Sequence, residues 1–323
     1  QAAAAIVRDE LPGVFLSVST DVLPTIRFYN RISTTVLDAY TGPVLRDYLS
    51  SLTAKLAEVG FDGVLLIMQS SGGVALPAAT LERPAATLLS GPAAGPRAGL
   101  ACTEPLAKRS CLVVDMGGTS FDASLVRDGR VELKAEGEID RLRIALPMLD
   151  IATIGAGGGS IGWIDGGGLL RMGPESAGAE PGPACYGRGG ERPTCTDANL
   201  ILGYLDPSFF AGGQLVLSPE RARQAIATQV ATPLGLEVGE AAAGMYRVIN
   251  ANMAHGVRDI TVKRGLDPRE FPMVVAGGAA GLHACMLARE LDIPMIIVPA
   301  AASTLCAAGM LLSDFQHDFV RSY

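Results

Sequence analysis

Residues 111–129 read CLVVDMGGTSFDASLVRDG and carry the most informative pattern in this sequence. A short apolar run rich in β-branched residues ends at Asp115, and two glycines and two hydroxyl residues follow it. A second, alternating run ends in Asp128-Gly129, a dipeptide that favours a tight hairpin turn. The stretch therefore predicts a strand, a glycine turn, a second strand and a hairpin, with the strand pattern continuing over 131–138.

The glycine turn after the first strand has the groups that a phosphate needs. Gly117 and Gly118 carry no Cβ, so the backbone can bend sharply and bring its N–H groups close to an anion. Thr119 and Ser120 add hydroxyl donors, and Asp115 can hold Mg²⁺ directly or through water. The pattern fits a nucleotide-phosphate loop, and it also fits an ordinary hairpin with a glycine bend.

A second glycine turn lies in 271–284, which reads FPMVVAGGAAGLHA. An apolar strand pattern runs into Gly277 and Gly278 and then into a helix. Glycines at this point allow a flat ring to lie against the backbone, and the start of the helix offers free N–H groups to an anion. A further strand at 295–298 and a helix of small residues at 303–312 follow.

Length and composition limit the class of protein. The 323 residues leave room for two domains or one large domain, and half of them are hydrophobic. The net charge of −7 and the lack of any basic run argue against nucleic acid as a main partner. Residues 293–312 are uncharged and long enough to span a membrane, but two prolines interrupt them, which favours a buried strand and a buried helix.

The six cysteines show no CxxC spacing and are expected to be reduced thiols in a cytosolic protein. Cys185 and Cys195 lie ten residues apart with Asp197 nearby, so a zinc site is a weak alternative. Metal ligands are normally closer together in sequence than these two cysteines.

Apolar spacing and capping residues predict the remaining elements. We expect strands at 15–18 and 63–68, and helices at 34–60, at 96–101, from a cap at 196–199 to 205, from Ser218 onward and at 240–265. Pro43 predicts a kink or a fresh start inside the first long helix. The sequence begins with QAAAAIVR, which resembles the interior of a helix without an initiator Met and suggests a fragment of a longer chain.

Three other features have two interpretations each. Residues 155–159 contain four glycines, which implies close backbone approach either to a ligand or to another domain. The polar turn at 69–73 either touches a ligand or is a plain exit from a strand. His255 lies on the long helix at 240–265, where a lone histidine is more often a core or surface residue than a ligand. The long Gly/Pro loop at 169–192 is expected to be functional or a mobile surface.

Together these stretches resemble the superfamily of actin, Hsp70 and the sugar kinases. DMGGTSFD at 115–122 is similar to its second phosphate loop, VAGGAAG at 275–281 to its adenosine loop, and SGPAAG at 90–95 and AAG at 307–309 to its connecting helices. Within that superfamily the chain resembles the hydantoinase A/5-oxoprolinase family, which includes N-methylhydantoinase A and the ATP-binding subunits of acetone and acetophenone carboxylases. The distinguishing motifs, which lie along nearly the whole chain, are MQSSGG at 68–73, PGPACYG at 181–187, TDANL at 196–200, GLDPR at 265–269 and LHA at 282–284.

The resemblance implies an α/β fold of the actin-like ATPase class, which is ribonuclease H-like, with ATP and Mg²⁺ as cofactors. It implies that Asp115 and Asp122 are catalytic and that Asp115 also binds the metal. The cofactor-binding residues that it implies are Gly117, Gly118, Thr119, Ser120, Gly277, Gly278 and Gly281. In the adenosine loop, Ala280 and Leu282 stand where the family more often has Gly and a Pro-Leu pair, which is a mild departure.

The function that the resemblance implies is that of an ATP-dependent hydrolase subunit. It would open a cyclic amide of the hydantoin or 5-oxoproline type by phosphorylating the substrate carbonyl, which creates a good leaving group. The alternatives are the ATP-binding subunit of an acetone- or acetophenone-type carboxylase and a non-catalytic nucleotide-binding module. The implied partners are a small cyclic amide or ketone and a hydantoinase B-type subunit or domain, with no nucleic acid and no membrane.

One departure from the family concerns the domain organisation. The family's first phosphate loop is an Asp-Gly-Gly-Thr turn, and the turn at Asp115 is the only one of this kind here. We therefore expect 1–100 to be the trailing part of the first lobe and 101–323 to be the second lobe. Because phosphoryl transfer needs donors on both sides of the transferred group, this chain alone is expected to be inactive.

Overall fold

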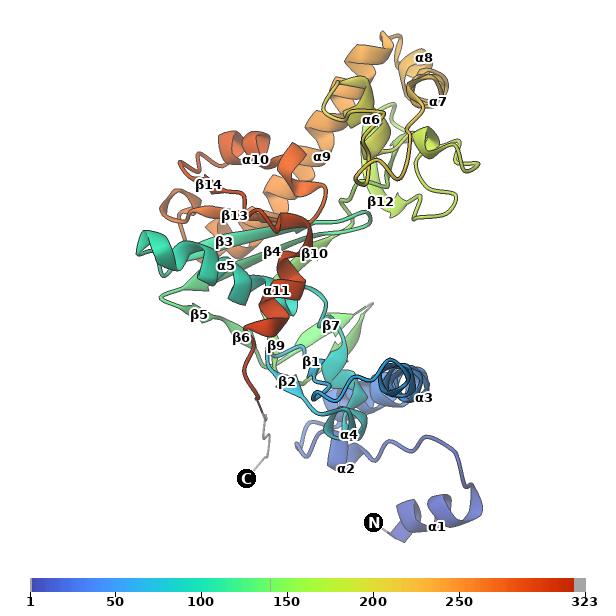
Figure 1. Cartoon of the computed structure of the whole chain (residues 1–323), viewed down its shortest axis with the longest axis vertical. Helices are drawn as coiled ribbons and strands as arrows, with labels where there is room; N and C mark the ends of the chain where they lie inside the picture. The colour runs from blue at the N-terminus through green and yellow to red at the C-terminus, as the bar shows by residue number, and fades with distance from the viewer. Residues whose placement is uncertain (1, 140, 317–323) are drawn as a thin grey trace. The chain divides into compact units, whose positions relative to one another are not determined.

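The computed structural model describes residues 2–139 and 141–316, and the chain divides into two units (Figure 1). Unit 1 contains Gln1–Arg97, Val131–Asp150 and Cys306–Tyr323, and unit 2 contains Ala98–Arg130 and Ile151–Leu305. The sequence predicted a single division at residue 100. The structure also divides the chain near that residue, but it adds 131–150 and the C-terminal segment to the first unit.

Within the described residues, unit 2 is built on a six-stranded sheet in the order β10-β4-β3-β13-β14, with β5 paired to β4. Its strands are β3 (Cys111–Met116), β4 (Phe121–Arg127), β5 (Arg130–Val131), β10 (Ile151–Ile154), β13 (Met273–Ala276) and β14 (Ile296–Ile297). β4 runs antiparallel to both β3 and β10, whereas β13 runs parallel to β3 and to β14. The strand, glycine turn, strand and hairpin predicted over 111–129 are therefore confirmed.

The long helix α9 (Val238–Ile260) packs against β4 and β10 of this sheet, and α10 (Ala284–Glu290) packs beside α9 (Figure 1). The apolar face of α9 is fully buried at Met245, Ile249, Met253 and Val257, and Val248 on the same helix is partly buried. The helix ends at Ile260 rather than near residue 265, because the next residue leaves helical geometry and 262–264 form a 3₁₀ turn.

Small residues in two further helices allow close packing. α5 (Gly95–Thr103) contains the predicted helix at 96–101, and a Cβ on Gly99 would lie 2.2 Å from Cγ2 of Val113. α11 (Leu305–Leu311) follows β14, and a Cβ on Gly309 would lie 2.1 Å from the carbonyl oxygen of Ala94. Backbone and side-chain packing therefore requires both glycines.

Between β10 and α9 the chain of unit 2 forms a strand pair and three short α-helices. β11 (Ser160–Ile164) and β12 (Leu170–Ser176) form an antiparallel pair, and α6 (Cys195–Ile201), α7 (Pro219–Ile226) and α8 (Thr232–Leu234) follow. Thr194 caps α6, because its hydroxyl accepts from Asp197 N while the Asp197 side chain accepts from Thr194 N. The predicted cap at Thr196 was wrong by two residues, and the helix ends at Ile201 instead of Leu205. The predicted cap at Ser218 is confirmed.

Unit 1 contains a 31-residue helix, α3 (Phe28–Glu58), and short strand pairs. Its other α-helices among the described residues are α1 (Ala2–Glu10), α2 (Ser19–Val22), α4 (Pro77–Glu82) and, from Cys306 onward, α11. Its strand pairs are β1 (Ile67–Met68) with β2 (Val74–Ala75), β6 (Leu133–Lys134) with β9 (Met148–Leu149), and β7 (Gly137–Ile139) with β8 (Leu142–Ile144). Leu37 of α3 packs with Leu23, Ile144, Leu146 and Met148. This shared core explains why 131–150 belongs to unit 1.

Three predictions in unit 1 were wrong. Residues 15–18 are not a strand, because they pair with no other strand among the described residues. Of the strand predicted at 63–68, only Ile67 and Met68 pair. α3 begins six residues earlier than predicted and passes through Pro43 without a fresh start.

Residues 293–312 contain a strand and a helix as predicted, and none of the described helices has the length and hydropathy to cross a membrane.

Candidate nucleotide-binding site

The two predicted glycine turns leave the sheet of unit 2 at the same edge. β3 and β13 are parallel neighbours, with Ala276 opposite Asp115, so both strands end side by side. The backbone N–H of Ala279 donates to the carbonyl oxygen of Met116 at 3.0 Å, which ties the second turn to the end of β3. In open α/β sheets, ligands bind outside the carboxyl ends of such strands. The structure therefore brings the predicted phosphate and adenosine turns together.

The glycines of these turns have two different roles. A Cβ on Gly277 would lie 2.3 Å from the carbonyl oxygen of Met116, and its φ of +83° is in the left-handed region, so the fold itself requires this glycine. In contrast, a Cβ on any of four other glycines would meet no atom within 4 Å. These open positions are Gly117, Gly118, Gly278 and Gly281. Bare backbone thus faces open space at the end of both strands, which suits close approach of a ligand.

The glycine-dense segment 155–159 forms backbone hydrogen bonds with the first turn. The N–H of Gly158 donates to Gly117 O at 3.0 Å, and the N–H of Gly159 donates to Gly118 O at 2.6 Å. A Cβ on Gly157 would lie 2.5 Å from the backbone nitrogen of Thr119. The close approach that these glycines permit is therefore to the phosphate turn of the same unit, whereas the sequence had indicated a ligand or another domain.

Two carboxylates lie next to the first turn. Asp115 and Asp122 are directly opposite each other in the β3–β4 pair, so their side chains share one face of the sheet. Asp122 accepts hydrogen bonds from Thr153 Oγ1 at 2.5 Å and from Ser120 Oγ at 3.5 Å. Burial raises the pKa of Asp122, the hydrogen bond from Thr153 opposes this, and the charge of Asp115 adds to the rise.

This carboxylate pair fits a nucleotide-bound magnesium ion. Mg²⁺ typically takes one or two carboxylates and completes its octahedron with waters and phosphate oxygens. Over residues 2–139 and 141–316, no group of three or more His, Cys, Asp or Glu side chains is arranged to hold a metal without such help. The hydroxyl of Ser120 contacts Asp122, whereas Thr119 is exposed beside Gly118.

The weak zinc alternative receives no support. Cys185 lies in an apolar cluster with Leu200 and Leu217, whereas Cys195 belongs to the main core of unit 2. The Asp197 carboxylate accepts hydrogen bonds from the backbone N–H groups of Ala184 and Cys185 at 3.2 and 2.7 Å. That carboxylate therefore fixes the loop before α6.

A buried polar cluster that the sequence did not predict forms around His283, which comes two residues after the adenosine turn. His283 is fully buried and stacks on Tyr246, with ring centroids 5.0 Å apart. Asn250 Nδ2 lies 3.0 Å from Nδ1 of His283, and Asn199 Nδ2 lies 3.2 Å from Nε2. The thiol of Cys195 is 3.5 Å from the same Nε2. Two of the quoted motifs, TDANL and LHA, contribute to this cluster, but only the tertiary fold shows that they meet.

Burial lowers the pKa of His283 to about 4, so the imidazole is neutral in the folded protein. The unfolded chain binds a proton near pH 6.5. The stability that a neutral His283 contributes is therefore fully present above about pH 6.5 and is lost as the pH falls toward 4. We expect urea midpoints of the parent chain to fall over this range and those of His283→Gln to fall less steeply.

His255 provides the matched control for that experiment. Its side chain is exposed on the same helix as Asn250, and its Nε2 lies 3.7 Å from Asp259. His255→Gln should keep the parent's pH dependence. An unchanged pH profile in His283→Gln would show that the buried imidazole does not carry this part of the stability.

The mixed sheet, the helices packed on it and the two glycine turns define unit 2 as an α/β lobe. A family model described as Hydantoinase/oxoprolinase matches residues 31–319. The chain therefore belongs to the hydantoinase/oxoprolinase family, as the motifs in its sequence predicted.

The relatives agree with this assignment. The alpha subunit of caprolactamase from Pseudomonas jessenii is 44% identical over 318 residues, which cover 98% of this chain and 46% of that protein. The crystal structure of the ATP-dependent caprolactamase from the same organism matches with a TM-score of 0.80 at 43% identity, over 98% of this chain and 46% of that one. A nucleotide-free acetone carboxylase structure matches with a TM-score of 0.85 at 32% identity, over 92% of this chain and 42% of that one.

The chain spans about half the length of these relatives. The α/β fold predicted from the sequence is confirmed by the two solved structures, because both similarities run along nearly the whole of this chain.

Proposed function

We propose that this chain is the nucleotide-binding part of an ATP-dependent enzyme that opens a cyclic amide. The observation that carries the proposal is the set of open glycines at the ends of β3 and β13, next to the carboxylates of Asp115 and Asp122. Backbone N–H groups with no side chain in front of them suit a phosphate chain and a flat base, and paired carboxylates suit the accompanying Mg²⁺.

In this proposal, each residue of the nucleotide site has a specific role. The N–H group of Gly118 binds a phosphate oxygen, and the exposed hydroxyl of Thr119 adds a donor. The N–H of Gly117 donates to the carbonyl oxygen of Ser120 at 3.1 Å and so holds the turn in shape. Asp115 holds Mg²⁺, while Ser120 and Thr153 hold Asp122 in place beside it. In a second group, Gly277 shapes the turn, and Gly278 and Gly281 leave room for the adenosine.

The chemistry of such a site is phosphoryl transfer. ATP supplies the phosphoryl group that makes the amide carbonyl oxygen a leaving group. The protein's contribution is positioning and charge neutralisation, which glycine turns and a metal-binding carboxylate pair provide. No covalent intermediate with a side chain of this chain is required.

A ketone carboxylase subunit is the second candidate. The TM-score of 0.85 to an acetone carboxylase favours it, whereas the higher identity of 43–44% to caprolactamase favours cyclic amides. A module that binds nucleotide without turnover is the third candidate. All three require the same nucleotide site, so nucleotide binding is the first property to test.

We expect this chain alone to bind ATP–Mg²⁺ without turnover and the complete natural protein to hydrolyse ATP when a cyclic amide is added. Calorimetry would measure binding, and phosphate release with hydantoin, 5-oxoproline, caprolactam or acetone plus bicarbonate would identify the substrate class. Equal turnover by the two proteins would contradict the need for a second set of donors opposite Gly118.

A pair of glycine variants controls the binding measurement. A Cβ has open space at both Gly118 and Gly166, but Gly166 lies outside the two turns, in the loop between β11 and β12. Gly118→Val should abolish ATP binding and Gly166→Val should not. Unchanged ATP binding by Gly118→Val would contradict the proposal that this turn binds the phosphates.

A further inference from the structure

The PGPACYG motif at 181–187 has no part in the nucleotide site, and the loop that contains it forms one wall of a cavity in unit 2. Another wall is formed by α7 and the π-helical turn Ala227–Ala231 that follows it. The cavity has a volume of about 370 Å³, and sites for small molecules typically have about 300–1,000 Å³. Short π-helical segments are rare and recur at functional sites. The cavity is therefore large enough for a second, small ligand.

The loop wall of this cavity is held in place by contacts along its length. Besides the Asp197 carboxylate that fixes the loop before α6, a Cβ on Gly190 would lie only 2.1 Å from the carbonyl oxygen of Gly182. The Gln229 side chain donates from Nε2 to the carbonyl oxygen of Glu191 at 2.9 Å, which ties the loop to the π-helical turn. The cavity is thus formed before a ligand binds, which lowers the entropic cost of binding.

Two side chains of opposite charge line the cavity, Arg221 from α7 and Glu191 from the loop. Neither side chain forms an ion pair or a hydrogen bond with any residue in 2–139 or 141–316. The guanidinium Nε of Arg221 would lie 3.8 Å from a Cβ on Gly187, so this charge is next to the loop. A ligand that enters the cavity therefore meets a positive and a negative group that are not yet paired.

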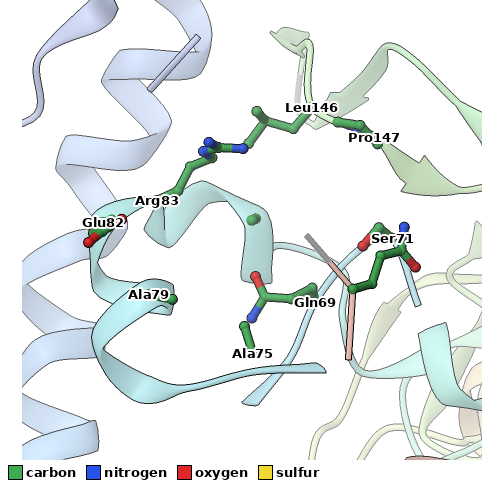
Figure 2. A pocket seen from close by; sticks show the side chains of 10 residues that line it. Gln69, Ser71, Ala75, Ala79, Glu82, Arg83, Leu146 and Pro147 are labelled. Atoms are coloured by element: carbon green, nitrogen blue, oxygen red, sulfur yellow. The ribbon is translucent and has the colours of Figure 1, made fainter. Parts of the chain in front are cut away.

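A cavity beside 69–75 in unit 1 also contains an arginine and a glutamate, but its arginine already acts on a carboxyl group (Figure 2). Burial raises the pKa of Asp38, and the charge of Arg83 opposes this rise. Arg83 therefore serves the structure of unit 1. This comparison favours the cavity of unit 2 as the ligand site.

The backbone adds a donor to the cavity of unit 2. Gly190 lines it and is buried, and the described residues provide no acceptor for its N–H. Buried backbone N–H groups nearly always have a partner, and a ligand oxygen would supply one. Thr228 donates its hydroxyl to the carbonyl oxygen of Gln224 at 2.9 Å, so the lone pairs of that hydroxyl are left for a ligand. The side-chain amide of Gln224 completes the polar lining.

We propose that this cavity binds a free amino acid with a polar side chain, in its zwitterionic form. The ligand carboxylate pairs with Arg221 and accepts from the N–H of Gly190, while the ligand ammonium pairs with Glu191. A polar side chain of the ligand meets the amide of Gln224. A simple anion would place its charge near Glu191 and a simple amine near Arg221, so only a zwitterion neutralises both groups. Ala184 and Ala225 are small and buried, which leaves room for the ligand.

The proposal goes beyond the proposed function, because binding in this cavity needs no nucleotide. L-glutamine is the probe, since its side chain is an amide. Two compounds of the same chain length each lack one charge: 4-carbamoylbutanoate has no ammonium, and 4-aminobutanamide has no carboxylate. A ligand of about ten non-hydrogen atoms reaches a Kd of about 1 mM at the efficiency of small fragments. Ligand-observed NMR on the whole chain without ATP measures such affinities.

Two variants remove one charge each and have matched controls. Arg221→Gln and Glu191→Gln should each weaken L-glutamine binding by about tenfold or more, because hydrogen bonds between charged groups are stronger than neutral ones. Arg223→Gln on α7 and Glu180→Gln in the loop are the controls, since both residues are exposed and neither lines the cavity. These controls should bind L-glutamine as the parent chain does.

The outcomes separate this proposal from the nucleotide site. No binding of L-glutamine by the parent chain at about 10 mM would overturn the proposal. Equal binding of either comparison compound would also overturn it, as would parent-like binding by Arg221→Gln or by Glu191→Gln. Urea midpoints confirm that each variant is folded. A chain that binds L-glutamine but not ATP would contradict the proposed function alone, and a chain that binds ATP but not L-glutamine would contradict the amino-acid site alone.

Discussion

Replacing Gly277 with alanine is expected to destabilise unit 2 by about 2–5 kcal/mol. About 1–2 kcal/mol comes from placing a Cβ on a residue at a φ of +83°, and about 1–3 kcal/mol from forcing atoms into a filled space. Met116 backbone and the Asp115 carboxylate fill this space, because the new Cβ would lie 2.3 Å from the carbonyl oxygen of Met116 and 2.4 Å from Oδ1 of Asp115. Neither strand end can move easily, since β3 and β13 are paired along four residues.

The next residue is the control for this experiment. Gly278 has no positive φ, and its Cβ would meet nothing within 4 Å. Gly278→Ala should therefore keep the free energy of unfolding, measured in urea, within about 0.5 kcal/mol of the parent while it weakens ATP binding. Equal urea midpoints for Gly277→Ala and the parent would contradict the close contact between the two strand ends. ATP binding that survives in Gly278→Ala would contradict the position of the adenosine.

Asp115→Asn in the complete natural protein is expected to lower ATP turnover by about 10²-fold or more. A metal ion that neutralises phosphoryl charge lowers the activation barrier by several kcal/mol, and each 1.4 kcal/mol corresponds to about a tenfold change in rate. An amide oxygen carries no net charge to hold Mg²⁺. Steady-state phosphate release at saturating substrate, measured over a range of Mg²⁺ concentrations, would show the loss and its metal dependence.

The same variant should fold at least as stably as the parent. The charge of Asp115 raises the pKa of Asp122, so the two carboxylates repel each other, and the amide removes that repulsion. Activity and stability therefore change in opposite directions, which distinguishes a functional carboxylate from a structural one. Asp128→Asn, at the exposed end of the hairpin, is the matched control and should change neither quantity. Full ATP turnover in Asp115→Asn would contradict the proposal that Asp115 holds the metal ion.

The local sequence was sufficient to predict the strands and glycine turns that form the candidate site. The strand–glycine patterns at 111–129 and 271–284 were predicted correctly because a buried strand and a tight turn are both visible in a short window. The isolated apolar runs at 15–18 and 63–66 look similar but form no strand, since a strand needs a partner with which to pair its backbone. The sequence does not show which runs will find one.

Tertiary contacts explain what the sequence left open. The glycines of 157–159 indicated close approach to a ligand or to another domain, and only the hydrogen bonds to Gly117 and Gly118 show that they pack on a turn of their own unit. His283 and Asn199 are 84 residues apart in the chain, so their contact depends on how α6 and α10 pack on α9. The assignment of 131–150 to unit 1 likewise depends on the apolar contacts of Ile144 and Leu146 with α3.

The discontinuous composition of unit 1 has a consequence for synthesis on the ribosome. Val74 forms a β-bridge with Phe315, and Arg97 forms an ion pair with Asp314 at 2.8 Å. At about 5–20 residues per second, roughly 10–45 s separate the translation of these N-terminal residues from that of their C-terminal contacts. All strands of the unit 2 sheet emerge earlier. Nascent chains should therefore complete the sheet of unit 2 first, although unit 1 begins at the N-terminus.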